Sequence, residues 1–155
     1  MPEAIIMIRK FRKEDAARCC EIINKNLVDM TDYSAELRTY FRQKNTPENL
    51  SRELTGFELA VVFEEAKSVI GVGVLDANVI KRVYVEPAEH GNGVGSAIMD
   101  ALETHAQSLG LHSVGLGSSP RAESFYVARG YTVRKRCTVE INGMEMPSIQ
   151  MEKNL

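Results

Sequence analysis

Cysteine is scarce in this chain, and the residues present do not suit a disulfide framework. There are three cysteines, two of them adjacent at Cys19 and Cys20. An odd number with this spacing favours a reducing compartment over a disulfide-stabilised extracellular domain. Because His90, His105 and His112 are not spaced from cysteines as metal-ligand pairs are, we expect no metal site.

Long apolar stretches are also missing. The longest runs are far too short to cross a bilayer, and the opening MPEAIIMIRKF lacks the apolar core of a signal peptide. The sequence does not decide whether translation starts at Met1 or Met7. We therefore expect a cytoplasmic protein with no membrane partner.

Neither sign of charge dominates. Lys and Arg number 19 against 21 Asp and Glu, a formal net charge of -2. Nucleic-acid-binding domains usually carry a basic footprint, so this balance gives no electrostatic case for a nucleic-acid partner. The 155 residues, 44% hydrophobic and 26% charged, contain no repeat, low-complexity tract or linker. A single domain over residues 1–155 is expected.

The most informative stretch covers residues 79–109. Its β-branched opening predicts a strand over 79–85, which Pro87 ends. A loop with three glycines follows, and then an apolar stripe with helical spacing: Val94, Ile98, Leu102, Ala106 and Leu109. Glycines without Cβ atoms and the free N–H groups of a helix N-terminus suit this loop to phosphate oxygens.

The glycine spacing excludes two common phosphate-binding classes. A dinucleotide fingerprint needs G-x-G-x-x-G, whereas here Gly95 arrives one residue early and Ser96 stands where the last glycine is required. A phosphate-loop NTPase needs Gly-Lys-Ser/Thr, which does not follow. A nicotinamide enzyme is therefore disfavoured.

The remaining pattern predicts an α/β fold. Strands are expected over residues 4–11, 58–63, 68–75, 113–116, 131–141 and 144–151, and helices over 16–27, 34–41, from 46 onward, 94–109 and 120–129. The two short helices after Ser34 and Thr46 are expected to form a flap outside the core. Asn142-Gly143 predicts a hairpin, and residues 79–116 a parallel crossover within a mostly antiparallel mixed sheet.

Two motifs resemble those of one enzyme superfamily. The segment V-Y-V-x-P-x-x-H-G-x-G-x-G at 83–95 resembles the acetyl-CoA pyrophosphate loop, Q/R-x-x-G-x-G/A, of the GNAT N-acetyltransferases, with His90 in the Gln/Arg place. Residues 119–131 are similar to the superfamily's N-x-x-A-x-x-F-Y-x-x-x-G-F, with Ser119 and Tyr131 replacing Asn and Phe. The order of elements resembles the GNAT fold along nearly the whole chain.

The resemblance implies a single-domain GNAT-like fold, with helices on both sheet faces and acetyl-CoA as co-substrate. The residues it assigns to acetyl-CoA are Val83, Tyr84, Val85, His90, Gly91, Asn92, Gly93, Val94, Gly95, Ser96 and Ser119. A backbone N–H near the end of the 79–85 strand would polarise the acetyl carbonyl. Tyr126 would donate a proton to the leaving thiolate; otherwise it packs beside Phe125 in the core.

No general base is evident. Val79 occupies the position where several superfamily members carry Glu, and valine cannot accept a proton. Asp76, Glu86 and Glu89 lie nearby in sequence but are expected to be solvated, so a water chain or a neutral amine would serve instead. Asp32, Tyr33 and Tyr40 on the expected flap are candidates to line an amine pocket.

The resulting hypothesis is an N-acetyltransferase that moves the acetyl group of acetyl-CoA to a primary amine of a small molecule or peptide, directly in a ternary complex. One alternative acceptor is a protein N-terminus or lysine. Another alternative is a non-catalytic acyl-CoA-binding sensor. A homodimer is a candidate assembly, and neither the acceptor nor the acyl length follows from the sequence.

Overall fold

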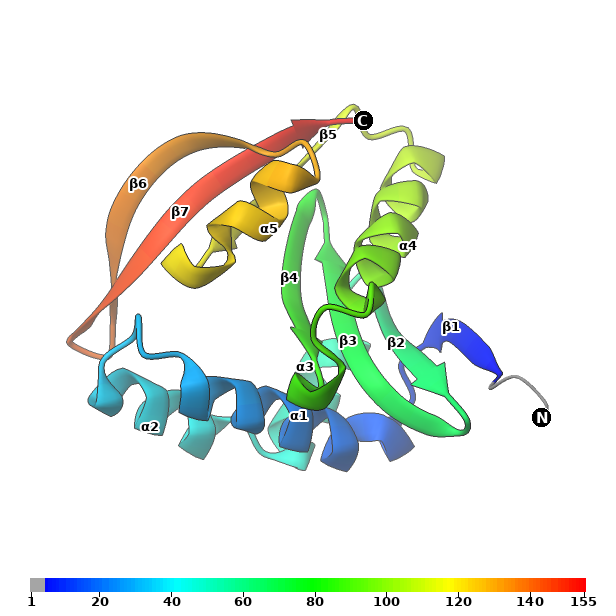
Figure 1. Ribbon diagram of the computed structural model, residues 1–155, viewed down its shortest axis with the longest axis horizontal. Coiled ribbons are helices and arrows are strands. Elements are labelled where there is room, and N and C mark those ends of the chain that lie inside the picture. Colours follow the sequence, from blue (N-terminus) through cyan, green and yellow to red (C-terminus); the bar gives the residue numbers. More distant parts are fainter. Residues whose placement is uncertain (1–4) are drawn as a thin grey trace.

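A seven-stranded sheet runs through the computed structural model, which describes residues 5–155 (Figure 1). Met1, a candidate start, and Ala4, expected in the first strand, lie outside the described residues. The strands are β1 (Ile6–Lys10), β2 (Leu59–Glu65), β3 (Ser68–Asp76), β4 (Val79–Val85), β5 (Ser113–Ser118), β6 (Thr132–Ile141) and β7 (Met144–Asn154). The helices are α1 (Ala16–Asp29), α2 (Ala35–Lys44), α3 (Pro47–Thr55), α4 (Val94–Ser108) and α5 (Glu123–Ala128).

The strand order is β1-β2-β3-β4-β5-β7-β6, and β4–β5 is the parallel pair in an otherwise antiparallel sheet. A parallel pair needs a crossover connection, and α4 supplies it. The expected mixed sheet and the crossover within residues 79–116 are therefore confirmed.

Helices cover both faces of the sheet. On one face, α4 buries Ile98, Met99 and Leu102 against the sheet, and Phe125 of α5 packs on the same cluster. On the other face, α1 and α3 form a second cluster with β2 and β3. Figure 1 shows α1, α2 and α3 together on one side of the strands and α4 on the other. The expected arrangement is confirmed.

Local capping and turn chemistry fixes several element boundaries. The Ser34 hydroxyl accepts a 3.1 Å hydrogen bond from Leu37 N at the start of α2, and the Thr46 hydroxyl accepts one of 3.2 Å from Asn49 N at the start of α3. Asn142 and Gly143 both have positive φ, as the two-residue turn between β6 and β7 requires. These predicted starts and this turn are confirmed.

The prediction that the two short helices form a flap outside the core is wrong. Leu37 of α2 is fully buried, and Leu50 and Leu54 of α3 belong to the core cluster shared with α1. Leu50 and Leu54 lie four residues apart and therefore on one side of the helix. The many polar residues around them hide this narrow apolar face in the sequence.

Candidate active site

A fork in the sheet positions the candidate site. The beginning of β4 pairs with the middle of β5, where Val79 faces Gly115 and Ile80 faces Leu116. Beyond these two pairs the strands separate, and a cleft of about 1070 Å³ lies along β4 from Ile80 to Val85. The cleft is lined from four directions: by the end of α1 and the loop after it, by β4, by the loop into α4, and by the segment from β5 to α5.

The glycine loop forms one wall of this cleft. Gly91 and Gly93 have φ of 85° and 83°, and a Cβ at either position would have no atom within 4 Å. Their backbone therefore faces open space that a ligand can approach closely. The first bond of α4 runs from Ala97 N to Gly93 O, so the N–H groups of the first turn lack intrahelical acceptors. This combination suits an anionic group.

Gly95 has a different role from the other two loop glycines. A Cβ there would lie 3.3 Å from the Phe125 ring of α5, so this glycine allows α4 and α5 to pack closely. Of the predicted coenzyme residues between 90 and 96, those lining the cleft are His90, Gly91, Gly93, Val94, Gly95 and Ser96. Asn92 is not among them, and its side-chain amide donates to Glu89 Oε2 at 3.1 Å.

The Val85 carbonyl at the end of β4 is bonded from two sides. The Nδ2 group of Asn26 on α1 donates to it at 2.8 Å, and the Nε2 atom of His90 lies 2.9 Å from it. The His90 ring therefore turns back toward β4. This contact connects the glycine loop to the end of β4, and both line the cleft.

Tyr126 lies in the cleft and also packs against the core. Its ring meets Phe125 edge-on, with centroids 5.1 Å apart, and Tyr131 similarly at 5.7 Å. Burial, with a smaller contribution from Tyr84, raises the pKa of Tyr126 to about 12. The phenol therefore stays protonated through the neutral range, and it can serve as a proton donor.

Two further tyrosines line the same cleft from other elements. Tyr33, in the loop after α1, has its ring 6.3 Å from Phe41, and Tyr84 projects from β4 against the α1–α3 cluster. Burial raises the pKa of both phenols, and Tyr84 also raises that of Tyr33. Three neutral phenols from three elements thus border one cleft.

The other predicted acceptor residues lie outside the cleft lining. Asp32 Oδ2 accepts a 3.0 Å bond from Arg121 N, which joins the loop after α1 to the segment before α5. Tyr40 packs on Phe41 of α2, with the Lys44 ammonium 5.6 Å from its ring centroid. Ser119, predicted to meet the coenzyme, does line the cleft.

The carboxylates near β4 differ from the expectation of free solvation. Glu86 is held by Lys25 at 2.9 Å and Arg18 at 3.1 Å, and its side chain is only 12% exposed. The prediction that it is solvated is wrong, because α1 supplies two cations beside it. Asp76 pairs with Lys81 at 2.9 Å on the surface.

Several cleft residues were not predicted from the sequence, among them Asn26, Arg82 and Arg121. Arg121 donates from its guanidinium to the Asp29 carbonyl, and Asn26 bonds Val85 as described. A signal existed for Arg82, since the charged pair Lys81-Arg82 interrupts an otherwise apolar strand.

Within residues 5–155, no helix has the length and apolar character to span a membrane. In the same range, no three His, Cys, Asp or Glu side chains gather as they would around a metal ion.

The fold and the glycine-loop cleft agree with a comparison to protein families. A family model described as an acetyltransferase (GNAT) domain matches residues 29–155. The chain belongs to this family of GNAT acetyltransferases, and is by family an acyltransferase. A search of curated proteins by sequence found no match.

Solved structures share this fold over all or nearly all of the chain. A GCN5-related N-acetyltransferase from Rhodopseudomonas palustris, whose description also reads aminotransferase class II, aligns with a TM-score of 0.90 at 28% identity, covering 100% of this chain and 99% of that one. PaiA N-acetyltransferase from Thermoplasma acidophilum, in complex with coenzyme A, aligns with a TM-score of 0.76 at 22% identity over 97% and 99%. The putative acetyltransferase yncA from Salmonella typhimurium, with acetyl-CoA, gives 0.66 and 23% over 97% and 94%.

Proposed function

We propose that this protein transfers the acetyl group of acetyl-CoA to a primary amine of a small molecule or peptide, directly within a ternary complex. The observation that carries the proposal is the convergence of the glycine loop and Tyr126 on the cleft at the β4–β5 fork. The PaiA and yncA structures hold coenzyme A and acetyl-CoA, which supports this coenzyme as the ligand.

The glycine loop is proposed to hold the diphosphate. Gly91 and Gly93 leave the backbone uncovered, and the α4 N-terminus adds N–H donors and a partial positive charge. Val83, Tyr84 and Val85 border the same cleft and are assigned to the coenzyme arm, together with Ser119. His90 is assigned to the loop's own geometry through its contact with Val85.

Acetyl transfer forms a C–N bond and breaks the C–S bond of the thioester. The departing thiolate gains a proton from Tyr126, the proposed donor, and the nitrogen loses a proton as it becomes an amide, which restores the phenol. The raised pKa makes the Tyr126 phenol a weaker acid. The same burial also favours the neutral thiol of coenzyme A over its thiolate, which assists the proton transfer. The amine must attack in its neutral form, although an alkyl amine with a pKa of about 10.4 is mostly protonated at pH 7.

No carboxylate is proposed as the base. The side chain at position 79 is valine, and Glu86 is committed to Lys25 and Arg18. The amine is therefore proposed to lose its proton to water before attack. A rate that rises with pH until the amine itself titrates would support this, and a plateau well below the amine pKa would indicate an enzyme base.

Two measurements test the activity. Calorimetry with coenzyme A and acetyl-CoA measures binding, and thiol release from acetyl-CoA is followed across polyamines, amino acids, peptides with free N-termini and lysine peptides. Binding with release on small amines or short peptides supports the proposal. Release confined to protein termini or lysines supports the alternative acceptor, binding without release across the panel supports a sensor, and no binding at millimolar coenzyme contradicts the proposal.

A further inference from the structure

Arg82 has an unusual backbone conformation for its place in the fold. Its φ is 57°, in the left-handed region that residues with a Cβ seldom adopt. Among the described residues, the other non-glycine positions with positive φ are Ala66, Lys67, Ala77 and Asn142, all in two-residue turns between strands. Arg82 instead lies inside β4.

The conformation of Arg82 coincides with a bulge between β3 and β4. Val74 faces Lys81 and Val72 faces Tyr84, so two steps along β3 match three along β4. One extra residue is therefore accommodated at this point of β4. Pairing with β5 stops just before it, after Ile80. The bulge thus lies where the fork opens.

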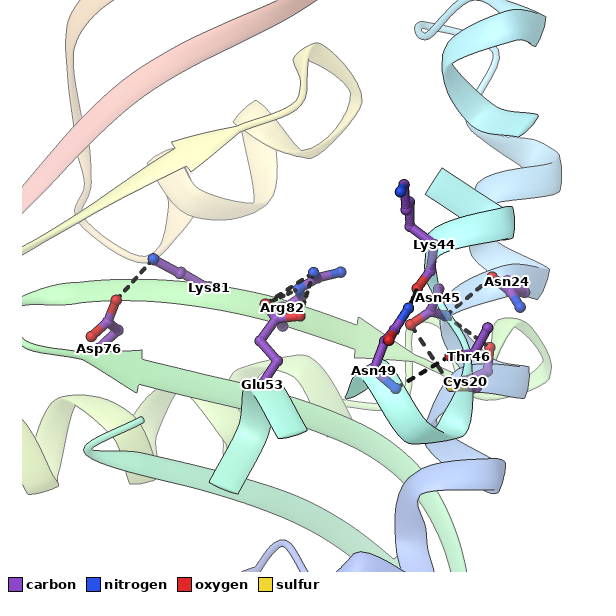
Figure 2. Close-up of polar contacts among 10 residues, drawn as sticks. All are labelled: Cys20, Asn24, Lys44, Asn45, Thr46, Asn49, Glu53, Asp76, Lys81 and Arg82. Carbon is purple, nitrogen blue, oxygen red and sulfur yellow. Dashed lines mark hydrogen bonds and ion pairs between the residues drawn. The ribbon is translucent and has the colours of Figure 1, made fainter. Parts of the chain in front are cut away.

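A carboxylate on α3 holds the Arg82 side chain. Glu53 Oε1 accepts from Nε at 3.2 Å and from Nη2 at 3.0 Å, and Oε2 accepts from Nη2 at 2.9 Å. Figure 2 shows Glu53 reaching from α3 to Arg82 on the neighbouring strand. Leu50 and Leu54 anchor α3 in the core, so Glu53 is presented from a fixed support.

The exact register of β4 matters to the cleft. Val83, Tyr84 and Val85, which follow the bulge, all line it. Because side chains alternate along a strand, loss of the extra residue would turn each of these side chains to the opposite face. Holding the bulge therefore holds the cleft wall.

We infer that Glu53 is a positioning residue for the transfer reaction: it holds Arg82 in the left-handed conformation and so keeps β4 bulged and the fork open. The inference rests on the proposed function for its readouts of coenzyme A binding and of activity. Two other roles are distinguishable. Glu53 could contact the acceptor amine directly, or the pair could be a surface ion pair of little consequence, since both side chains are about one third exposed, 34% and 35%.

A double-mutant cycle separates these roles, because glycine adopts positive φ without the help of an ion pair. The variants are Glu53→Gln, Arg82→Gly, their combination, and Arg82→Ala. Each is measured for coenzyme A affinity, for kcat and KM, and for melting temperature. Asp76→Asn is the matched control. Asp76 at the end of β3 pairs with Lys81 of β4, and the two side chains are similarly exposed, 39% and 42%, but neither residue is left-handed (Figure 2).

As single substitutions, Glu53→Gln and Arg82→Ala are each expected to weaken coenzyme A binding roughly fivefold. This factor corresponds to the free-energy cost of a left-handed residue with a Cβ, which the ion pair no longer offsets. In the Arg82→Gly variant, adding Glu53→Gln is expected to leave coenzyme A affinity unchanged, whatever affinity the Arg82→Gly variant itself has. Asp76→Asn is expected to leave binding as it is.

Two results would overturn the inference. One is an equal loss from Glu53→Gln in both backgrounds, with the loss in acceptor KM, which would place Glu53 on the acceptor. The other is no effect of Glu53→Gln in the natural background. If the protein binds no coenzyme A, the proposed function fails, and the cycle is then read from melting temperature and from amide hydrogen exchange along β4, which need no ligand.

Discussion

The Tyr131 hydroxyl donates a 2.9 Å hydrogen bond to Oε2 of Glu103 in the interior of the protein. The same carboxylate accepts from Lys153 at 2.7 Å and from Arg129 at 3.3 Å, so its charge is compensated. Tyr131 also forms the wall against which the Tyr126 ring packs. A buried polar cluster thus supports the candidate proton donor from behind.

Tyr131→Phe removes this hydrogen bond and keeps the ring. The free energy of unfolding is expected to fall by about 1 kcal/mol, because Lys153 and Arg129 still satisfy Glu103. Urea unfolding measures it, and Tyr40→Phe is the control, since Tyr40 is half-buried on α2 away from this cluster. An equal effect of the two substitutions would show that the Glu103 bond adds nothing.

Tyr126→Phe is expected to lower kcat about 100-fold, the lower end of what general acids contribute, and to leave acetyl-CoA affinity nearly unchanged. The measurements are steady-state kinetics and calorimetry, with Tyr131→Phe as the comparison that alters the packing neighbour instead. An unchanged kcat would remove Tyr126 from the acid role. Since its pKa lies near 12, no loss of kcat with a midpoint near pH 10 is expected from this phenol.

Gly93→Ala is expected to weaken coenzyme A binding about tenfold or more, since a hydrogen bond to a charged group is worth about 1.5–3 kcal/mol. Gly110→Ala is a matched control: its φ of 81° is almost the same as the 83° of Gly93, and a Cβ meets no atom within 4 Å at either position. Both variants should lose similar stability from backbone strain. Equal affinity in the two would contradict a ligand at the loop.

Acid should weaken the anchoring of β1 to the start of α1. Burial raises the pKa of Asp15, but two hydrogen bonds from Arg9 and one from Arg12 N outweigh it and hold the pKa below its ordinary 3.8. A lowered folded pKa means that this stabilisation is present above about pH 4 and is lost as the pH falls further.

Asp15→Asn is therefore expected to cost about 1–3 kcal/mol at pH 7 and progressively less below pH 4. Melting temperatures from pH 7 to pH 2 measure this, with the exposed Glu14→Gln as control. A cost that stays constant over the whole range would show that the charge of Asp15 is not what stabilises β1.

Local chemistry made much of the fold predictable. Element boundaries are fixed by hydrogen bonds and φ angles of residues close together in the sequence, at Ser34, Thr46-Pro47 and Asn142-Gly143. The glycine loop and the strand-helix-strand crossover around it are likewise marked by residues close together in the sequence. Such features depend little on the rest of the chain. The sequence therefore located the loop and Tyr126 on what proves to be a single cleft.

Long-range partners account for the rest. The burial of Leu50 depends on α1 and the sheet, and the Glu53–Arg82 pair joins positions 29 residues apart. The solvation of Glu86 was mispredicted for the same reason, because Lys25 lies 61 residues away along the chain. Alternation along one strand does not reveal what a helix from elsewhere places beside it.

The two residue pairs that join β4 to β5 also have a mechanical consequence. Within the described sheet, they are the only strand pairing between the half formed by β1–β4 and the half formed by β5–β7. Both halves line the cleft, so a ligand that contacts both walls stabilises their association by its binding energy. The fork that admits a ligand is thus also the place where the two halves of the sheet are least connected, and where a bound ligand adds contacts between them.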